Sequence, residues 1–258
     1  MTGALEHTFY MLARHVRNLS RQPVWIVILL AQPFFWLVLY SQLFSRLTEL
    51  PGFETTSYIQ FLTPGIVVLT AFFTGSWNGM SMINDLDRGV IERFLATPAR
   101  RSSLVLGHVL QCAVNAWIQT LIVLGIGYAM GARVAGGVLG WVVILFVSGL
   151  VAATFSGMSQ GIALFARREE TMIAVANFIG LPLIFISSAL IAETLMPTWM
   201  RWAARFNPVE WGVVAAREAM MPGTDWSRVG VYVGLLVAAT VVTASFGTWA
   251  FRAYRRTL

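Results

Sequence analysis

The chain has 258 residues, of which 57% are hydrophobic and only 12% are charged. This composition excludes an ordinary soluble domain, in which about a quarter of the residues are charged. The formal net charge is +6 and the chain contains no lysine, so neither a lysine-containing phosphate-binding loop nor a lysine Schiff base can form here.

Six apolar stretches are each long enough to cross a bilayer, which takes about 20 residues. They cover residues 24–44, 60–83, 104–130, 138–165, 171–192 and 229–251. The sequence therefore predicts an all-α integral membrane protein, in which residues 1–258 form one transmembrane domain and both termini lie on the same side.

The distribution of arginine indicates which side that is, because cytoplasmic loops of membrane proteins collect basic residues. The side that holds the termini would hold twelve of the eighteen arginines: Arg14, Arg17, Arg21, Arg88, Arg93, Arg100, Arg101, Arg167, Arg168, Arg252, Arg255 and Arg256. We therefore expect both termini in the cytoplasm, and we explain the basic pI in this way rather than by binding to nucleic acid.

Residues 1–23 precede the first predicted span. Apolar residues recur there at helical spacing, with basic residues around them: Leu5, Phe9, Leu12 and Val16 against His7, Arg14, Arg17 and Arg21. This pattern predicts an amphipathic helix lying on the inner membrane face. The alternative is a frayed cytoplasmic tail.

Residues 84–103 form a charged loop between the second and third spans. On a helix, Val90, Ile91, Phe94 and Leu95 would make one apolar stripe with charged residues beside it, and Pro98 would end the helix. A short helix with an apolar face and mixed charge is typical of a protein-docking element. The alternative, a solvated basic loop, explains the arginines but not the apolar stripe.

The fourth span contains GMSQG, residues 157–161, which matches the G-x-S-x-G pattern of hydrolases. That motif requires a strand, a tight turn and a helix, whereas a membrane span requires a helix throughout. An intramembrane serine protease of the rhomboid kind would take its histidine from a later span, but all three histidines precede Ser159. We interpret Gly157 and Gly161 as helix-packing positions.

The sequence contains few residues that could form a metal-binding site or a proton relay. His7 and His15 lie in the first segment, His108 stands alone near the start of the third span, and no Cys/His cluster occurs. The polar residues inside the spans are amides and hydroxyls rather than the buried acids or histidines of proton-driven pumps. We infer that the energy for any uphill transport must come from another protein.

Residues 193–228 are too long for an ordinary outer loop. Four tryptophans suit the membrane interface, namely Trp199, Trp202, Trp211 and Trp226. The stretch 209–221 is apolar but too short to span, so we expect a re-entrant helical hairpin in the outer leaflet, broken at Asn207 and Pro208.

Three segments in order resemble the membrane subunit (permease) of ABC-2 type exporters, most closely the daunorubicin-resistance permease group. They are YIQFLTPGIVV at 58–68, NDLDRGVIERFLATPARRSSLVLGHVL at 84–110 and FNPVEWGVVAAREAM at 206–220. The residues that carry the resemblance include Pro64, Gly65, Asp85, Gly89, Arg93, Phe94, Pro98, Arg101, Leu106, Gly107, Asn207, Pro208 and Arg217.

The resemblance implies a non-catalytic transmembrane subunit in a bacterial plasma membrane. It would pair with a second copy or a paralogous permease above two ATP-binding subunits, which hold ATP and Mg²⁺, so this chain needs no cofactor or metal of its own. The helix within 84–103 would be the coupling helix. We expect it to transmit energy through Glu92, Arg93 and Phe94, with Arg88 and Arg101 framing the dock.

The cargo implied by the resemblance is a hydrophobic drug-like molecule or lipid, exported at the interface between two permeases near spans 1, 2 and 5. Similar permeases of this size export lipid-linked polysaccharides, which is the alternative within the same architecture. A stand-alone carrier or channel is the alternative from another class, and it would work without ATP.

Overall fold

The structure is a computed structural model that describes residues 23–44, 57–89 and 102–254, with the backbone alone for 23–30, 102–106 and 254. The predicted helix within 1–23 and the predicted stripe within 90–101 lie outside these residues. The described residues form helices and connecting turns, with no strand among them.

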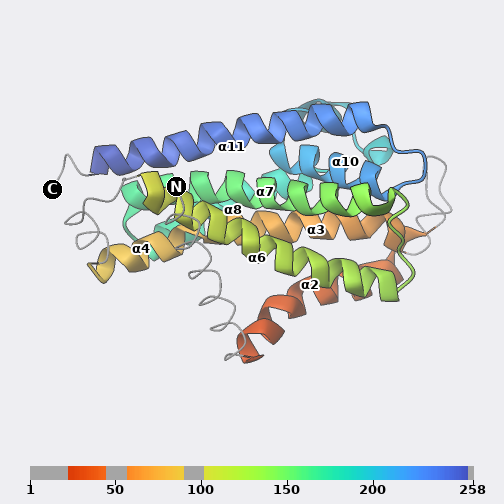
Figure 1. The fold of residues 1–258 in the computed structure, drawn as a ribbon, viewed down its shortest axis with the longest axis horizontal. Coiled ribbons are helices and arrows are strands. Elements are labelled where there is room, and N and C mark those ends of the chain that lie inside the picture. Colours follow the sequence, from red (N-terminus) through yellow and green to blue (C-terminus); the bar gives the residue numbers. More distant parts are fainter. Residues whose placement is uncertain (1–22, 45–56, 90–101, 255–258) are drawn as a thin grey trace.

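The long helices run roughly side by side along the molecule (Figure 1). They are α2 (Pro23–Leu43), α3 (Tyr58–Trp77), α6 (Ser102–Ala129), α7 (Gly137–Ala166), α8 (Glu169–Phe185) and α11 (Trp226–Tyr254). The short elements are α4 (Gly79–Asp87), η2 (Glu193–Leu195), α9 (Thr198–Ala204) and α10 (Pro208–Met220).

Helix α7 lies at the centre of the bundle and packs against α3, α4, α6, α10 and α11. Small residues on its buried face, such as Ala152, Ser156 and Gly157, let neighbouring helices approach closely. Two clusters of buried apolar residues fill the interior: a large one around Leu62, Val67 and Val151, and a smaller one beneath α4 that includes Met82 and Phe251.

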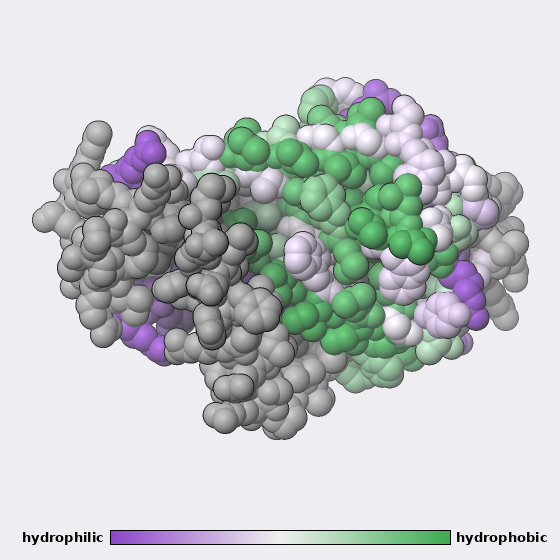
Figure 2. Space-filling view, in the orientation of Figure 1, coloured by the Kyte–Doolittle hydropathy of each residue, from purple (hydrophilic) through white to green (hydrophobic). Residues whose placement is uncertain are grey.

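Four helical stretches of the described residues are long and apolar enough to cross a membrane: Tyr58–Asp87, Gly107–Ala129, Gly137–Ala166 and Trp226–Ala253. Figure 2 shows the matching surface, with hydrophobic residues over the middle of this face and hydrophilic residues toward its two ends. The structure therefore has the length and surface pattern of a membrane protein.

Helix α8 is shorter than the apolar run 171–192 predicted. It ends at Phe185, and residues 186–192 form turns and bends. Apolar residues continue beyond that point, so hydropathy alone gave no reason for the helix to stop. The stop has a tertiary cause, because the backbone and side chain of Ser188 are bound by residues of α10.

Helix α10 begins where the Asn207-Pro208 pair predicts a boundary. The Asn207 side chain accepts a hydrogen bond from the Val209 amide at 2.9 Å, which caps the helix, and Pro208 occupies its first turn. Helix α10 packs against α3, α7 and α11, with most of its residues buried. Segment 193–228 therefore contributes a packed helix to the bundle.

Candidate functional site

The charged segment of 84–103 leaves the bundle at the end of α4. Arg88 caps this helix, and its amide donates to the Asn84 carbonyl at 3.2 Å. Gly89 follows with a φ of +62°, a left-handed conformation that glycine adopts without steric cost. The other proposed coupling residues, Glu92, Arg93, Phe94 and Arg101, lie outside the described residues, as does the family-motif residue Pro98.

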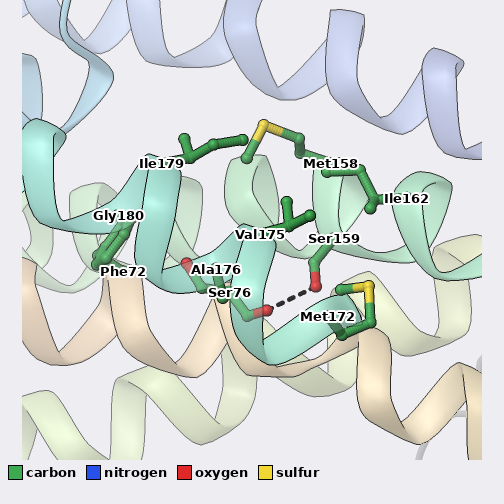
Figure 3. A pocket seen from close by; sticks show the side chains of 10 residues that line it. All are labelled: Phe72, Ser76, Met158, Ser159, Ile162, Met172, Val175, Ala176, Ile179 and Gly180. Carbon is green, nitrogen blue, oxygen red and sulfur yellow. Dashed lines mark hydrogen bonds between the residues drawn. The ribbon is translucent and has the colours of Figure 1, made fainter. Parts of the chain in front are cut away.

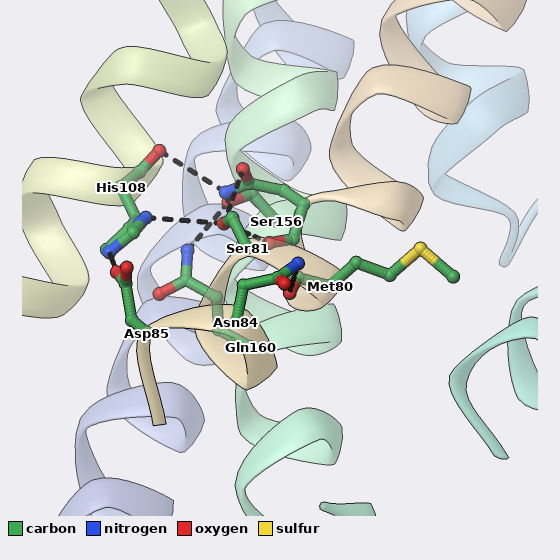
Figure 4. A network of polar contacts seen from close by, with 8 residues as sticks. Met80, Ser81, Asn84, Asp85, His108, Ser156 and Gln160 are labelled. Carbon is green, nitrogen blue, oxygen red and sulfur yellow. Dashed lines mark hydrogen bonds and ion pairs between the residues drawn. The ribbon is translucent and has the colours of Figure 1, made fainter. Parts of the chain in front are cut away.

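The expectation that His108 stands alone is wrong. Its Nε2 atom lies 3.2 Å from the Asp85 carboxylate, and its Nδ1 atom lies 3.4 Å from the Ser81 hydroxyl (Figure 4). The contact joins α4 to the start of α6 across the charged loop. Sequence reasoning missed it because the partners are separated by the whole loop.

A break at Asn78 separates α3 from α4, and α7 holds it. The Asn78 side chain donates to the Ser156 hydroxyl at 2.7 Å and to the His108 carbonyl at 3.3 Å. The Ser159 hydroxyl donates to the Ser76 carbonyl at 2.6 Å and accepts from the Gly79 amide at 3.0 Å. We call Asn78, Ser81, Asp85, His108, Ser156 and Ser159 the hinge network.

The GMSQG motif is thus part of a continuous helix, α7, and its serine serves the hinge network. Its glycines face α11: a Cβ added at Gly157 would lie 2.8 Å from the Thr243 carbonyl carbon, and one at Gly161 would lie 2.3 Å from the Phe246 ring. The motif therefore combines two close contacts with α11, at Gly157 and Gly161, with the Ser159 hydroxyl, which forms hydrogen bonds at the α3–α4 break.

At the opposite end of the bundle, Ser188 is held on all its polar groups. Its amide and hydroxyl donate to the Glu210 carboxylate, the latter at 2.8 Å. Its carbonyl and hydroxyl accept from Arg217 at 2.7 and 3.0 Å. The Arg217 guanidinium also lies 3.9 Å above the Phe61 ring. We call Phe61, Ser188, Glu210 and Arg217 the Ser188 clamp.

Burial sets the electrostatics of the clamp. It raises the pKa of the Glu210 carboxyl, while the hydrogen bonds from Ser188 and the charge of Arg217 act against this rise. Burial lowers the pKa of Arg217 to about 10, which leaves it charged at neutral pH. Glu210 and Arg217 therefore meet through Ser188 in the interior of the bundle.

Family-motif residues from distant segments converge on the turn after α8. A Cβ at Gly65 would lie only 2.1 Å from the Ala189 carbonyl oxygen, so α3 touches that turn directly. The Asn207 side chain donates to the Leu183 carbonyl at 2.7 Å. Arg217 binds Ser188, as described above, and Pro64 and Pro208 lie beside these contacts in α3 and α10. These residues fix the turn against the bundle.

Sequence reasoning missed Glu210 and Ser188, although Glu210 left a signal. Glu210 is an acid within the apolar run that forms α10, and it is only 5% exposed. A buried carboxylate needs partners, so its position called for a basic residue and hydrogen-bond donors nearby. The identity of the donor, a serine more than 20 residues earlier, is a tertiary fact.

A mostly apolar cavity lies between α3, α7 and α8 (Figure 3). Its space of about 290 Å³ includes open solvent, and a water-sized molecule finds only about 20 Å³ of room in it, enough for about one water. Phe72, Ser76, Met158, Ser159, Ile162, Met172, Val175, Ala176, Ile179 and Gly180 line it. One hydroxyl in the lining belongs to Ser76 of α3, just before the α3–α4 break, and the other to Ser159 of α7, and the remaining lining is apolar. Among the described residues, no group of three histidine, cysteine or acidic side chains could hold a metal ion.

Comparisons with known proteins give one consistent result. A family model described as ABC-2 type transporter matches residues 6–221. A daunorubicin resistance ABC transporter permease protein of Streptomyces coeruleorubidus is 25% identical over 98% of this chain and 87% of its own length. A protein of Cyanophora paradoxa described as a transport permease is 27% identical over 83% of this chain and 73% of its own. An inner membrane transport permease of Escherichia coli is 24% identical over 89% and 88%.

Proposed function

Because the chain belongs to the ABC-2 type transporter family, we propose that it is the membrane subunit of an ATP-driven exporter, energised by a separate ATP-binding subunit. The observation that carries this proposal is the family match over residues 6–221, which contains both the charged segment and the Ser188 clamp. The chain would be non-catalytic, with ATP and Mg²⁺ bound by the partner. The similarity to a drug-resistance permease over almost the whole chain favours export.

The proposed topology has six spans. Four of these spans would be the four long apolar stretches. The other two would be α2, which has 21 residues, and α8, whose 17 residues are followed by the apolar turn at 186–192. One transporter would contain two permease chains, either two copies of this one or this one and a paralogue, above two ATP-binding subunits.

The end of the bundle that holds α4 would face the cytoplasm of a bacterial cell. Arg88, Arg167 and Arg252 lie at the ends of α4, α7 and α11, and the arginine-rich segment 90–101 leaves from the same end. The C-terminal end of α11 also lies there (Figure 1). The Ser188 clamp and α10 would then lie toward the outer face.

Coupling to the ATPase would occur at the charged segment between α4 and α6. Glu92, Arg93 and Phe94 would contact the ATPase, with Arg88 and Arg101 on either side. A ligand-driven change in a protein needs contacts that differ between its two states. Closure of the ATPase dimer on ATP would change the contacts of this segment and so move α4 and α6.

The cargo would be a hydrophobic drug-like molecule or a lipid. The similarity to a daunorubicin resistance permease over almost the whole chain supports this choice. Aromatic side chains around a wide mouth would instead favour a lipid-linked polysaccharide. The cargo would pass between two permeases, near α2, α3 and α8.

Transport in vesicles tests the proposal, with daunorubicin as the probe because a relative is named for resistance to it. Inside-out vesicles that contain the chain and its ATPase should accumulate daunorubicin when ATP is added. Vesicles with the ATPase inactivated in its phosphate-binding lysine are the matched control and should show no ATP-dependent uptake. Uptake without ATP would contradict the proposal and indicate a carrier.

A further inference from the structure

The charged segment connects α4 to α6, and side chains of these two helices contact each other near the points where the segment begins and ends. Asp85 is two residues before the end of α4 at Asp87, and His108 lies in the second turn of α6. Their side chains are 3.2 Å apart and only partly exposed, at 29% and 16%. The described residues on either side of segment 90–101 therefore meet in one histidine–carboxylate contact (Figure 4).

This histidine–carboxylate contact is continuous with contacts to α7. The Nδ1 atom of His108 lies 3.4 Å from Ser81, and its carbonyl accepts from Asn78 at 3.3 Å. The Asn78 side chain then reaches Ser156 of α7 at 2.7 Å. Three helices, α4, α6 and α7, are thus tied together within a few residues of the α3–α4 break.

Helix α4 is a short helix that connects the α3–α4 break to the charged segment. At one end Gly79 lies so close to Ser159 that an added Cβ would be 2.5 Å from the hydroxyl oxygen, which fixes this end against α7. Along its length Met82 and Ile83 are buried in the small apolar cluster. Its other end continues directly into the segment that we propose as the ATPase dock.

We propose that Asp85 and His108 are positioning residues for energy coupling: they hold α4 and the start of α6 together so that both move as one body. The inference rests on the proposed function. A force on a loop with unconnected ends can be absorbed by sliding of one helix past the other. With the ends joined, the same force displaces both helices and reaches α7 through Asn78 and Ser156. Chains of packed and hydrogen-bonded groups of this kind carry coupling between distant sites.

Substitution of either residue in the complex with its ATPase tests this role. Asp85→Asn and His108→Gln should leave the rate of ATP hydrolysis within about twofold of the parent. The amount of daunorubicin transported per ATP should fall by about tenfold or more, which lies within the usual range for coupling between two sites. The exchange variant Asp85→His/His108→Asp keeps both groups in reversed positions and should restore most of the transport. Glu218→Gln is the control, because it removes an exposed ion pair with Arg228 at the opposite end of the bundle.

A distance measurement gives a readout that does not depend on the cargo. Spin labels on cysteines at Asn84 and Leu110 report the spacing of α4 and α6, and labels at Asn84 and Ser245 report the spacing of α4 and α11, all with Cys112→Ala. On ATP binding to the parent complex, the second distance should change while the first stays constant. In Asp85→Asn the distribution of the α4–α6 distance should become broader. In the exchange variant this distribution should become narrow again.

Three results would overturn the inference. Asp85→Asn and His108→Gln could transport as efficiently per ATP as the parent, the exchange variant could fail to restore either transport or the α4–α6 distance, or the α4–α6 distance could change on ATP binding in the parent itself. Failure of the parent to bind an ATPase at all is a different result, because it refutes the proposed function and this inference with it.

Discussion

Replacing Arg217 with methionine should lower the free energy of unfolding by about 3–5 kcal/mol, the usual cost of leaving a buried charge without its partner. The Glu210 carboxylate would stay in the interior with Ser188 as its hydrogen-bond donor and no positive charge nearby. Ser188 would lose the two hydrogen bonds that Arg217 gives it, and the turn after α8 would lose its link to α10. Thermal and denaturant unfolding in detergent measure the effect.

The control for this variant is Arg228→Met, which breaks the exposed ion pair with Glu218 and should cost less than about 1 kcal/mol. The double variant Arg217→Met/Glu210→Gln should recover much of the lost stability, because it removes the charge that was left unpaired. Equal unfolding midpoints for Arg217→Met and Arg228→Met would show that the Ser188 clamp is not a stabilising element.

The stability of the Arg217→Met variant should depend on pH in a defined direction. Burial already raises the pKa of Glu210, and loss of Arg217 removes a charge that lowers it. A carboxyl whose pKa is higher in the folded than in the unfolded protein favours folding at low pH, and this contribution is lost as the pH rises through the folded-state pKa. Arg217→Met should therefore regain stability relative to the parent as the pH falls from neutral toward the ordinary glutamate range.

Replacing Gly65 with alanine should also destabilise the protein, by about 1–3 kcal/mol or more, because overpacking forces backbone shifts. The added Cβ would lie 2.1 Å from the Ala189 carbonyl oxygen and 2.9 Å from its carbon, and neither backbone atom can rotate away. Helix α3 and the turn after α8 would have to separate. Unfolding measurements under the same conditions give the magnitude.

Gly125→Ala is the matched control for Gly65→Ala, since it makes the same change in a helix where nothing lies within 4 Å of the new methyl group. It should be neutral or should stabilise the protein by up to about 1 kcal/mol, as alanine in place of glycine does in a helix. If Gly65→Ala proves as stable as Gly125→Ala, the contact between α3 and the turn after α8 is not tight in the folded protein.

The sequence identified the helices because long apolar runs leave few other structures for a chain of this composition. It also located the break before α10, since Asn207 and Pro208 act locally, as cap and first-turn residue. Local signals could not locate the end of α8. Its apolar run continues past Phe185, and the helix stops where Glu210 and Arg217 bind Ser188.

The two polar clusters show the same limit for the candidate site. Arg217 was selected through a family resemblance, yet its partners Ser188 and Phe61 lie in other segments and no spacing rule connects them. Asp85 and His108 are 23 residues apart on separate helices, and they meet because α4 and α6 both pack against α7. Such pairs follow from tertiary structure, which periodicity and hydropathy do not encode.

The central claim is that an ATPase drives this chain through the charged segment, and gentle purification from the native membrane tests it most directly. We expect an ATP-binding subunit with a phosphate-binding loop to be recovered in about one-to-one ratio with this chain, and a well-expressed Arg93→Glu variant to recover much less of it. A chain that is purified alone, and that transports solute in vesicles without ATP, would contradict the account.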